Sequence, residues 1–152
     1  MGLLSRLLGP GHRPRDLLAD LGEDYRAEVG QAAHLRQHAE RSRYPQAAAA
    51  LRRLAEIEDR HAAWLRERLL GLGGSVPSVT PGALAGNNPW ERAVAAFEAA
   101  QRKRRRLVEQ IGHWDPEEPV VVDLLQRIER EDQRGFGVYE DLIMRSDPQS
   151  QD

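Results

Sequence analysis

A glutamate and a histidine three residues apart, Glu58 and His61, are the side chains of this sequence best suited to bind a metal ion. Residues three apart on an α-helix share one face, so both would point the same way. The apolar residues around them recur at steps of three and four, which places the pair on the side expected to face a core. Because burying an unpartnered carboxylate is costly, the pair requires a cation or a hydrogen-bond donor.

The chain as a whole predicts four helices, near residues 15–43, 45–72, 89–112 and 120–145. Each helix has one acidic residue within or beside its apolar stripe, near the middle of the helix. These residues are Glu28, Glu58, Glu98 and Glu131, of which Glu98 lies at the edge of its stripe. For the third helix, the predicted stripe is Val94, Phe97, Gln101, Arg104, Val108 and Ile111. Carboxylate oxygens with one imidazole suit iron or manganese.

The connections indicate how these helices are arranged. Residues 73–88 are rich in Gly, Pro, Ser and Asn, which predicts a loop. This loop is long enough to cross a whole bundle, so the helices on either side of it can run parallel. We expect an all-α bundle over residues 15–145, an N-terminal arm over 1–14 and a disordered tail over 146–152. The leucines of the arm could form a docking peptide or a membrane-surface anchor, but we prefer a flap over the bundle end or a frayed terminus.

Composition limits the remaining classes of function. A chain of 152 residues fits one domain with a sizeable core. Its net charge of −2 provides no overall attraction to nucleic acid or membranes. The absence of cysteine excludes disulfides, thiolate catalysis and cysteine zinc sites, and no apolar run is long enough to span a membrane. We therefore expect a cytoplasmic protein. Lys103 is the only lysine, which we interpret as a coding bias.

The pattern of these motifs resembles the ferritin-like superfamily, and within it the rubrerythrin and bacterioferritin-type branch. The motifs are Tyr25-x-x-Glu28, Glu58-x-x-His61, Glu98 in mid-helix, and Ile128-x-x-Glu131. The resemblance covers residues 15 to 145 approximately. It implies a ferritin-like four-helix bundle with a long crossover between helices 2 and 3, and a homodimer, because many members dimerise. Members hold two metal ions and oxidise ferrous iron or reduce peroxide or oxygen.

The resemblance also implies ligands. Members use a glutamate from helices 1 and 3 and a Glu-x-x-His from helices 2 and 4. Glu28, Glu58 and His61 match one metal position, and Glu98 and Glu131 match part of the other.

The fourth helix departs from the family pattern, because Arg134 stands where members have a histidine. A guanidinium is always charged and has no lone pair for a metal. We expect Arg134 to donate to Glu131 or Glu98 and to occupy the place of the second ion. One bound ion is therefore favoured over two, with weak redox turnover.

Three interpretations of the sequence remain. The first is a ferritin-like protein that binds iron or manganese, with ferroxidase- or peroxidase-type activity if it is an enzyme. The second is a degenerate ferritin-like bundle without metal, whose acids pair with arginines and which acts as a structural or protein-interaction module. The third is an unrelated helical bundle or adaptor. The first two differ in whether Glu28, Glu58 and His61 converge on open coordination space or are already bonded to arginine.

Overall fold

The computed structural model describes residues 15–147, and nearly all of this range except one long connection is helical. The helices are α1 (Leu17–Arg41), α2 (Pro45–Gly71), α3 (Pro89–Trp114) and α4 (Pro119–Ser146). No strand occurs among residues 15–147. The all-α prediction is confirmed, and every predicted helix end lies within two residues of the observed one. The predicted arm, residues 1–14, and residues 148–152 of the predicted tail lie outside the described range.

Local sequence explains where helices α1 and α3 begin. The Asp16 carboxylate accepts hydrogen bonds from the backbone N–H groups of Leu18 and Ala19 at the start of α1. At the start of α3, the Asn88 side chain accepts from the N–H of Glu91 at 2.8 Å. Such caps satisfy amide groups that have no partner within the helix.

A glycine ends α2. The N–H of Gly73 donates to the carbonyl of Leu70 at 3.0 Å, and that of Gly74 donates to Leu69 at 2.9 Å. This pair of bonds forms a Schellman motif, in which Gly73 adopts a φ of 78°. Glycine takes this left-handed conformation without the steric cost of a β-carbon. The helix therefore stops here, and the crossover begins.

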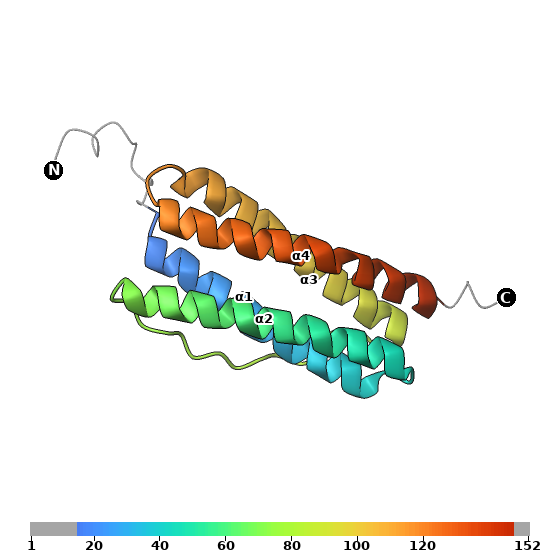
Figure 1. Cartoon of the computed structure of the whole chain (residues 1–152). Coiled ribbons are helices and arrows are strands. Elements are labelled where there is room, and N and C mark those ends of the chain that lie inside the picture. The colour runs from blue at the N-terminus through green and yellow to red at the C-terminus, as the bar shows by residue number, and fades with distance from the viewer. Residues whose placement is uncertain (1–14, 148–152) are drawn as a thin grey trace, which may run out of the picture.

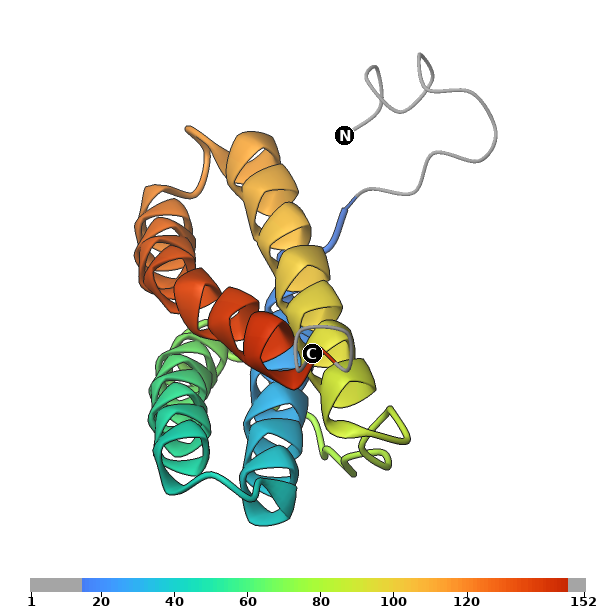
Figure 2. The same cartoon turned by 90° about the vertical axis from the view of Figure 1, so that its right-hand side faces the viewer.

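The crossover runs the length of the bundle between α2 and α3 (Figure 1). Consequently α2 and α3 point in the same direction, while α1–α2 and α3–α4 form antiparallel hairpins. Seen from the end, the four helices surround one common axis (Figure 2). The long crossover predicted from residues 73–88 is confirmed.

The core consists of two apolar clusters. One lies toward the α1–α2 turn, and its largest members are Leu35, Leu51, Leu54, Tyr139 and Leu142. The other lies toward the α3–α4 turn and comprises Leu21, Leu65, Leu69, Leu107, Val121, Leu125 and Ile128. Between the two clusters, the helices bury charged or titratable residues, which are Asp24, Glu28, Glu58, His61, Lys103 and Asp132. The middle of the bundle is therefore a polar layer.

The predicted stripe of α3 is wrong by one position. The residues that α3 buries are Ala93, Ala100, Lys103, Leu107, Gln110 and Trp114. The prediction followed the larger apolar residues, but Val108 is half exposed and Arg104 pairs with Glu129 near the surface. Small alanines face the core instead, together with two polar residues. This shift places Lys103 in the polar layer.

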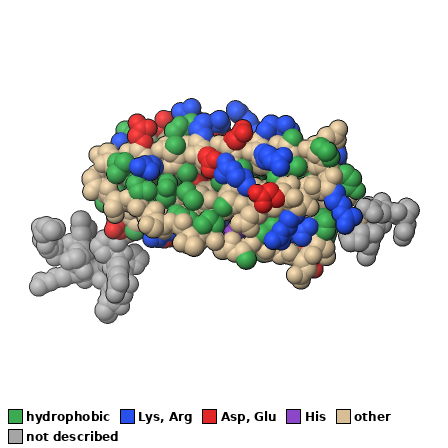
Figure 3. Space-filling model, turned by 90° about the horizontal axis from the view of Figure 1, so that it is seen from below, with side chains coloured by type: hydrophobic (Ala, Val, Ile, Leu, Met, Phe, Trp, Pro, Cys, Tyr) green, Lys and Arg blue, Asp and Glu red, His purple; other side chains and the backbone are tan. Residues whose placement is uncertain are grey.

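On the face shown in Figure 3, acidic and basic side chains are interspersed among apolar ones. Within residues 15–147, none of the helices combines the length and the hydrophobicity that a membrane span requires.

Candidate metal centre

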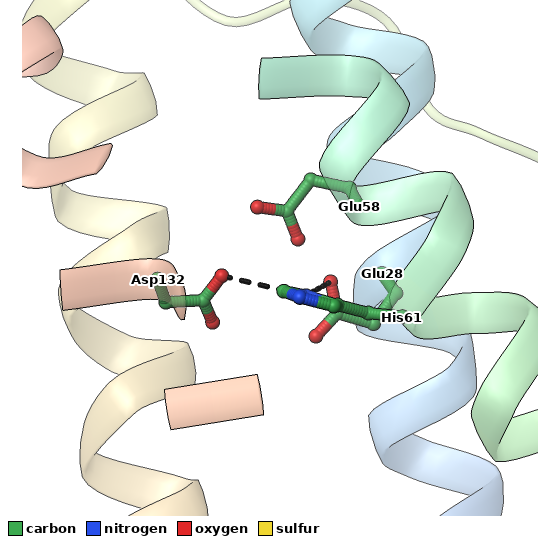
Figure 4. Close-up of side chains that lie close together, drawn as sticks. All are labelled: Glu28, Glu58, His61 and Asp132. Carbon is green, nitrogen blue, oxygen red and sulfur yellow. Dashed lines mark ion pairs between the residues drawn. The ribbon is translucent and has the colours of Figure 1, made fainter. Parts of the chain in front are cut away.

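Four buried side chains from three helices converge in the polar layer. They are Glu28 of α1, Glu58 and His61 of α2, and Asp132 of α4 (Figure 4). Each offers one donor atom, and these four atoms lie within 4.8 Å of one another. The structure thus brings together Glu28, Glu58 and His61 and adds Asp132, which sequence reasoning missed.

Helical spacing positions these donors. Glu58 and His61 lie on the face of α2 that also buries Leu54 and Leu65. On α4, Asp132 lies four residues after the buried Ile128, on the face that points inward.

Lys103 of α3 pairs with all three carboxylates of this cluster. Its Nζ lies 3.0 Å from Glu28 Oε2 and 3.1 Å from Asp132 Oδ2, and it also donates to Glu58 Oε2. Lys103 is only 4% exposed. An ammonium group has three donors and a compact charge, so it acts here as an internal cation.

One ammonium cannot balance three ionised carboxylates in a buried site. Burial, reinforced by the neighbouring Glu28, raises the pKa of Glu58 to about 8. Burial likewise raises the pKa of Asp132 to about 7, despite the attraction of Lys103, and raises the pKa of Glu28. Burial alone would lower the pKa of Lys103, but the three carboxylates outweigh it and raise that pKa. The cluster therefore requires protons or a further cation.

Glu131 lies behind His61, on the side away from the cluster. His61 Nε2 is 3.3 Å from Glu131 Oε2, and Arg60 donates to the same carboxylate at 2.9 Å. Burial opposes ionisation of Glu131, but its bonds to Arg60 and His61 lower its pKa. Because an ionised carboxylate only accepts hydrogen bonds, this contact favours the imidazole tautomer that carries its proton on Nε2.

This tautomer leaves the lone pair of His61 on Nδ1. Nδ1 lies 3.5 Å from Asp132 Oδ1 and 3.8 Å from Glu28 Oε2, so it faces the cluster. A histidine held at one nitrogen by a carboxylate and free at the other is the usual arrangement of a metal ligand.

Several atoms at this point have no hydrogen-bond partner among the described residues. They are Glu28 Oε1, His61 Nδ1 and both carboxylate oxygens of Asp132, although Oδ2 is ion-paired with Lys103. Buried polar atoms without partners are uncommon, and a group of them indicates a place where an ion or a water molecule binds. The donor set of three carboxylates and one imidazole fits one ion such as iron or manganese.

Three of the predicted site residues lie outside the cluster. Glu131, which was predicted as a ligand, bonds to His61 and Arg60 instead. The Glu98 side chain is exposed, and the residue that α3 directs into the cluster is Lys103, five positions later. Arg134 is also exposed and makes no ion pair with Glu98 or Glu131 within the described range. The structure thus shows neither of the bonds that we expected Arg134 to make. Lys103 lies in the cluster because the inward-facing residues of α3 come one position before those predicted from the sequence.

Comparisons with known proteins bear on the fold. No protein-family model matches the sequence, and no curated protein sequence is significantly similar to it. The structure is similar to the crystal structure of the bacterioferritin BfrA from M. tuberculosis, with a TM-score of 0.75. The sequences are 21% identical, and the match covers 86% of this chain and 84% of BfrA. This likeness shows that the chain has the fold of a ferritin-like four-helix bundle.

Proposed function

We propose that this protein binds one divalent transition-metal ion, iron or manganese, through Glu28, Glu58, His61 and Asp132. The observation that carries the proposal is the convergence of these four donors within 4.8 Å, with several of their atoms unpartnered. The bacterioferritin-like fold supports it, because buried carboxylates on facing helices hold metal in such bundles.

Lys103 takes the place of a second ion in this proposal. The three carboxylates carry three negative charges when ionised, and one ammonium with one divalent ion neutralises them. A second divalent ion would leave excess positive charge in a buried site, which is costly. Glu98 and Arg134 do not enter the coordination, because both are exposed.

The protein's own residues hold and orient the ion. Glu131 accepts a hydrogen bond from His61 Nε2, and Arg60 holds Glu131 in place through a second bond. When bound, iron supplies one-electron redox chemistry. A single ion lacks the neighbour that shares electrons when peroxide or oxygen is reduced, so we expect weak ferroxidase or peroxidase turnover. The homodimer and the cytoplasmic location stay predictions.

The same lysine supports a second candidate function. Because Lys103 already pairs with all three carboxylates, it can serve as a permanent counterion without metal. The protein would then be a metal-free bundle acting as a structural or protein-interaction module.

Metal stoichiometry separates these functions. We would titrate metal-free protein with ferrous iron under nitrogen and, separately, with manganese, and count tightly bound equivalents. One equivalent, lost in Asp132→Asn and retained in the exposed-site control Glu98→Gln, supports the mononuclear site. No binding to the unaltered protein supports the metal-free bundle, and two tight equivalents refute both.

A further inference from the structure

A surface groove of about 300 Å³ lies between α2 and α4, outside the cluster. Its lining includes Arg53, Leu54, Ile57, Arg60, Glu131 and Arg134. We propose that this groove binds a small organic carboxylate with an apolar body. The proposal does not depend on metal binding, because no donor atom of the cluster would contact the ligand.

The floor of the groove is apolar and has room for a ligand body. Leu54, Ile57 and Val138 contribute aliphatic side chains. Gly135 of α4 is buried among them, and a β-carbon there would lie 3.0 Å from Leu54 Cδ2. Glycine thus lets α4 approach Leu54 closely at the base of the groove. A volume of this size is at the lower end for ligand sites, which fits a small molecule.

The rim of the groove has unbalanced positive charge. Arg60 is bonded to Glu131, which is also bonded to His61 and is the only acidic residue of the lining. Arg53 of α2 and Arg134 of α4 are exposed, and neither forms an ion pair within residues 15–147. Two guanidinium groups beside an apolar floor complement a carboxylate on an aliphatic chain, since arginine binds carboxylates through paired donors.

The groove lies next to the polar layer. A second, much smaller cavity of about 10 Å³ has Glu58, Lys103 and Asp132 in its lining. The residues that it shares with the groove are Leu54, Ile57, Glu131 and Gly135. That volume suits one water molecule at most. A ligand in the groove would therefore lie over Glu131, separated from the cluster by that side chain and by Leu54.

Octanoate is a suitable probe of this site. We would add it to ¹⁵N-labelled metal-free protein and follow the amide resonances. Two control ligands separate the contributions: octanol lacks the charge, and acetate lacks the apolar body. The expected result is saturable binding of octanoate that shifts Leu54, Gly135 and Val138, with octanol and acetate each at least about tenfold weaker. Equal affinity for octanol, or saturable shifts elsewhere only, would overturn the proposal.

Three variants test the assigned residues. The double variant Arg53→Gln, Arg134→Gln should bind octanoate about tenfold more weakly, or weaker still. Arg52→Gln, at an exposed neighbouring position outside the groove, should leave its affinity unchanged. Ala50→Leu, which adds bulk to the groove lining while keeping both arginines, should also abolish binding. Undiminished octanoate affinity in the folded double variant would contradict the proposal, whatever the metal titration shows.

Discussion

Lys103 Nζ lies 3.0 Å from Glu28 Oε2, joining the only lysine of the chain to a fully buried carboxylate of the opposite hairpin. This ion pair connects α3 to α1 across the bundle. It means that α3 contributes a cation to the polar layer, while the other three helices contribute acids. Because Lys103 already supplies one positive charge to three carboxylates, we expect the polar layer to accept one divalent ion and not two.

Removing the Lys103 charge should destabilise the metal-free protein strongly. Lys103→Met keeps most of the side-chain length but leaves three buried carboxyl groups without their cation. Losing one partner of a buried ion pair costs about 3–5 kcal/mol. Thermal unfolding at pH 8 should show a marked decrease in Tm, partly reversed by added manganese. Arg102→Met, at an exposed position of the same helix, is the control and should change Tm little. Equal melting of the two variants would show that Lys103 is not the required counterion.

Replacing Lys103 by an acid should change the metal stoichiometry. Lys103→Glu removes the internal cation and adds a fourth carboxylate, which favours a second divalent ion. The ferrous titration should move from one equivalent toward two. Arg134→His serves as the comparison, because this position is exposed and should stay at one equivalent. A second equivalent in Arg134→His but not in Lys103→Glu would restore the role that the sequence suggested for Arg134.

The carboxylate behind the histidine should tune metal affinity. Glu131→Ala removes the acceptor of the His61 Nε2 proton, so Nδ1 is no longer fixed toward the cluster. Loss of such a supporting carboxylate typically weakens metal binding 10- to 100-fold. Competition with a chelator of known affinity would measure this loss. Asp123→Ala, at an exposed position of α4, should keep the original affinity. If both variants bind equally well, Glu131 does not orient His61.

The sequence predicted the fold and the α1 and α2 side of the polar layer for a clear reason. Glu28, Glu58 and His61 interrupt stripes of leucine and alanine that leave one choice of inward face. The four helices and the crossover follow from the same stripes and from the glycine- and proline-rich connector.

The α3 and α4 side could not be predicted in the same way. On α3 the inward face combines small alanines with Lys103, so hydrophobicity favoured the neighbouring face with Phe97. On α4, Glu131 and Asp132 are adjacent acids, and only packing decides which is buried. The one available signal was that Lys103 is the sole lysine among many arginines. That signal has meaning only once its three carboxylate partners are known.

The stability of the metal-free protein should fall as the pH rises from 6.5 to 8.5. Burial raises the pKa of Glu58 from 4.5 to about 8 and that of Asp132 from 3.8 to about 7. Between the ordinary and the raised pKa of each group, the folded protein retains a proton that the unfolded chain has released. The stability that comes from these protonated carboxyl groups is lost as the pH rises through the folded-state pKa values. We start the measured range at pH 6.5 because of His38, whose pKa burial lowers to about 4. His38 makes the stability rise with pH, but it does so below pH 6.5.

Thermal unfolding in this window, without metal, should show Tm falling by at least about 3 °C, which corresponds to roughly 1 kcal/mol for a chain of this size. Asp132→Asn should make the decline shallower, because the amide cannot ionise, while Asp123→Asn at the surface should not. Manganese should oppose the decline, since a bound cation stabilises the ionised carboxylates. A constant or rising Tm in the unaltered protein would mean that the three carboxyl groups are already ionised at pH 6.5. Lys103 would then be a sufficient counterion by itself, which favours the metal-free bundle over the mononuclear site.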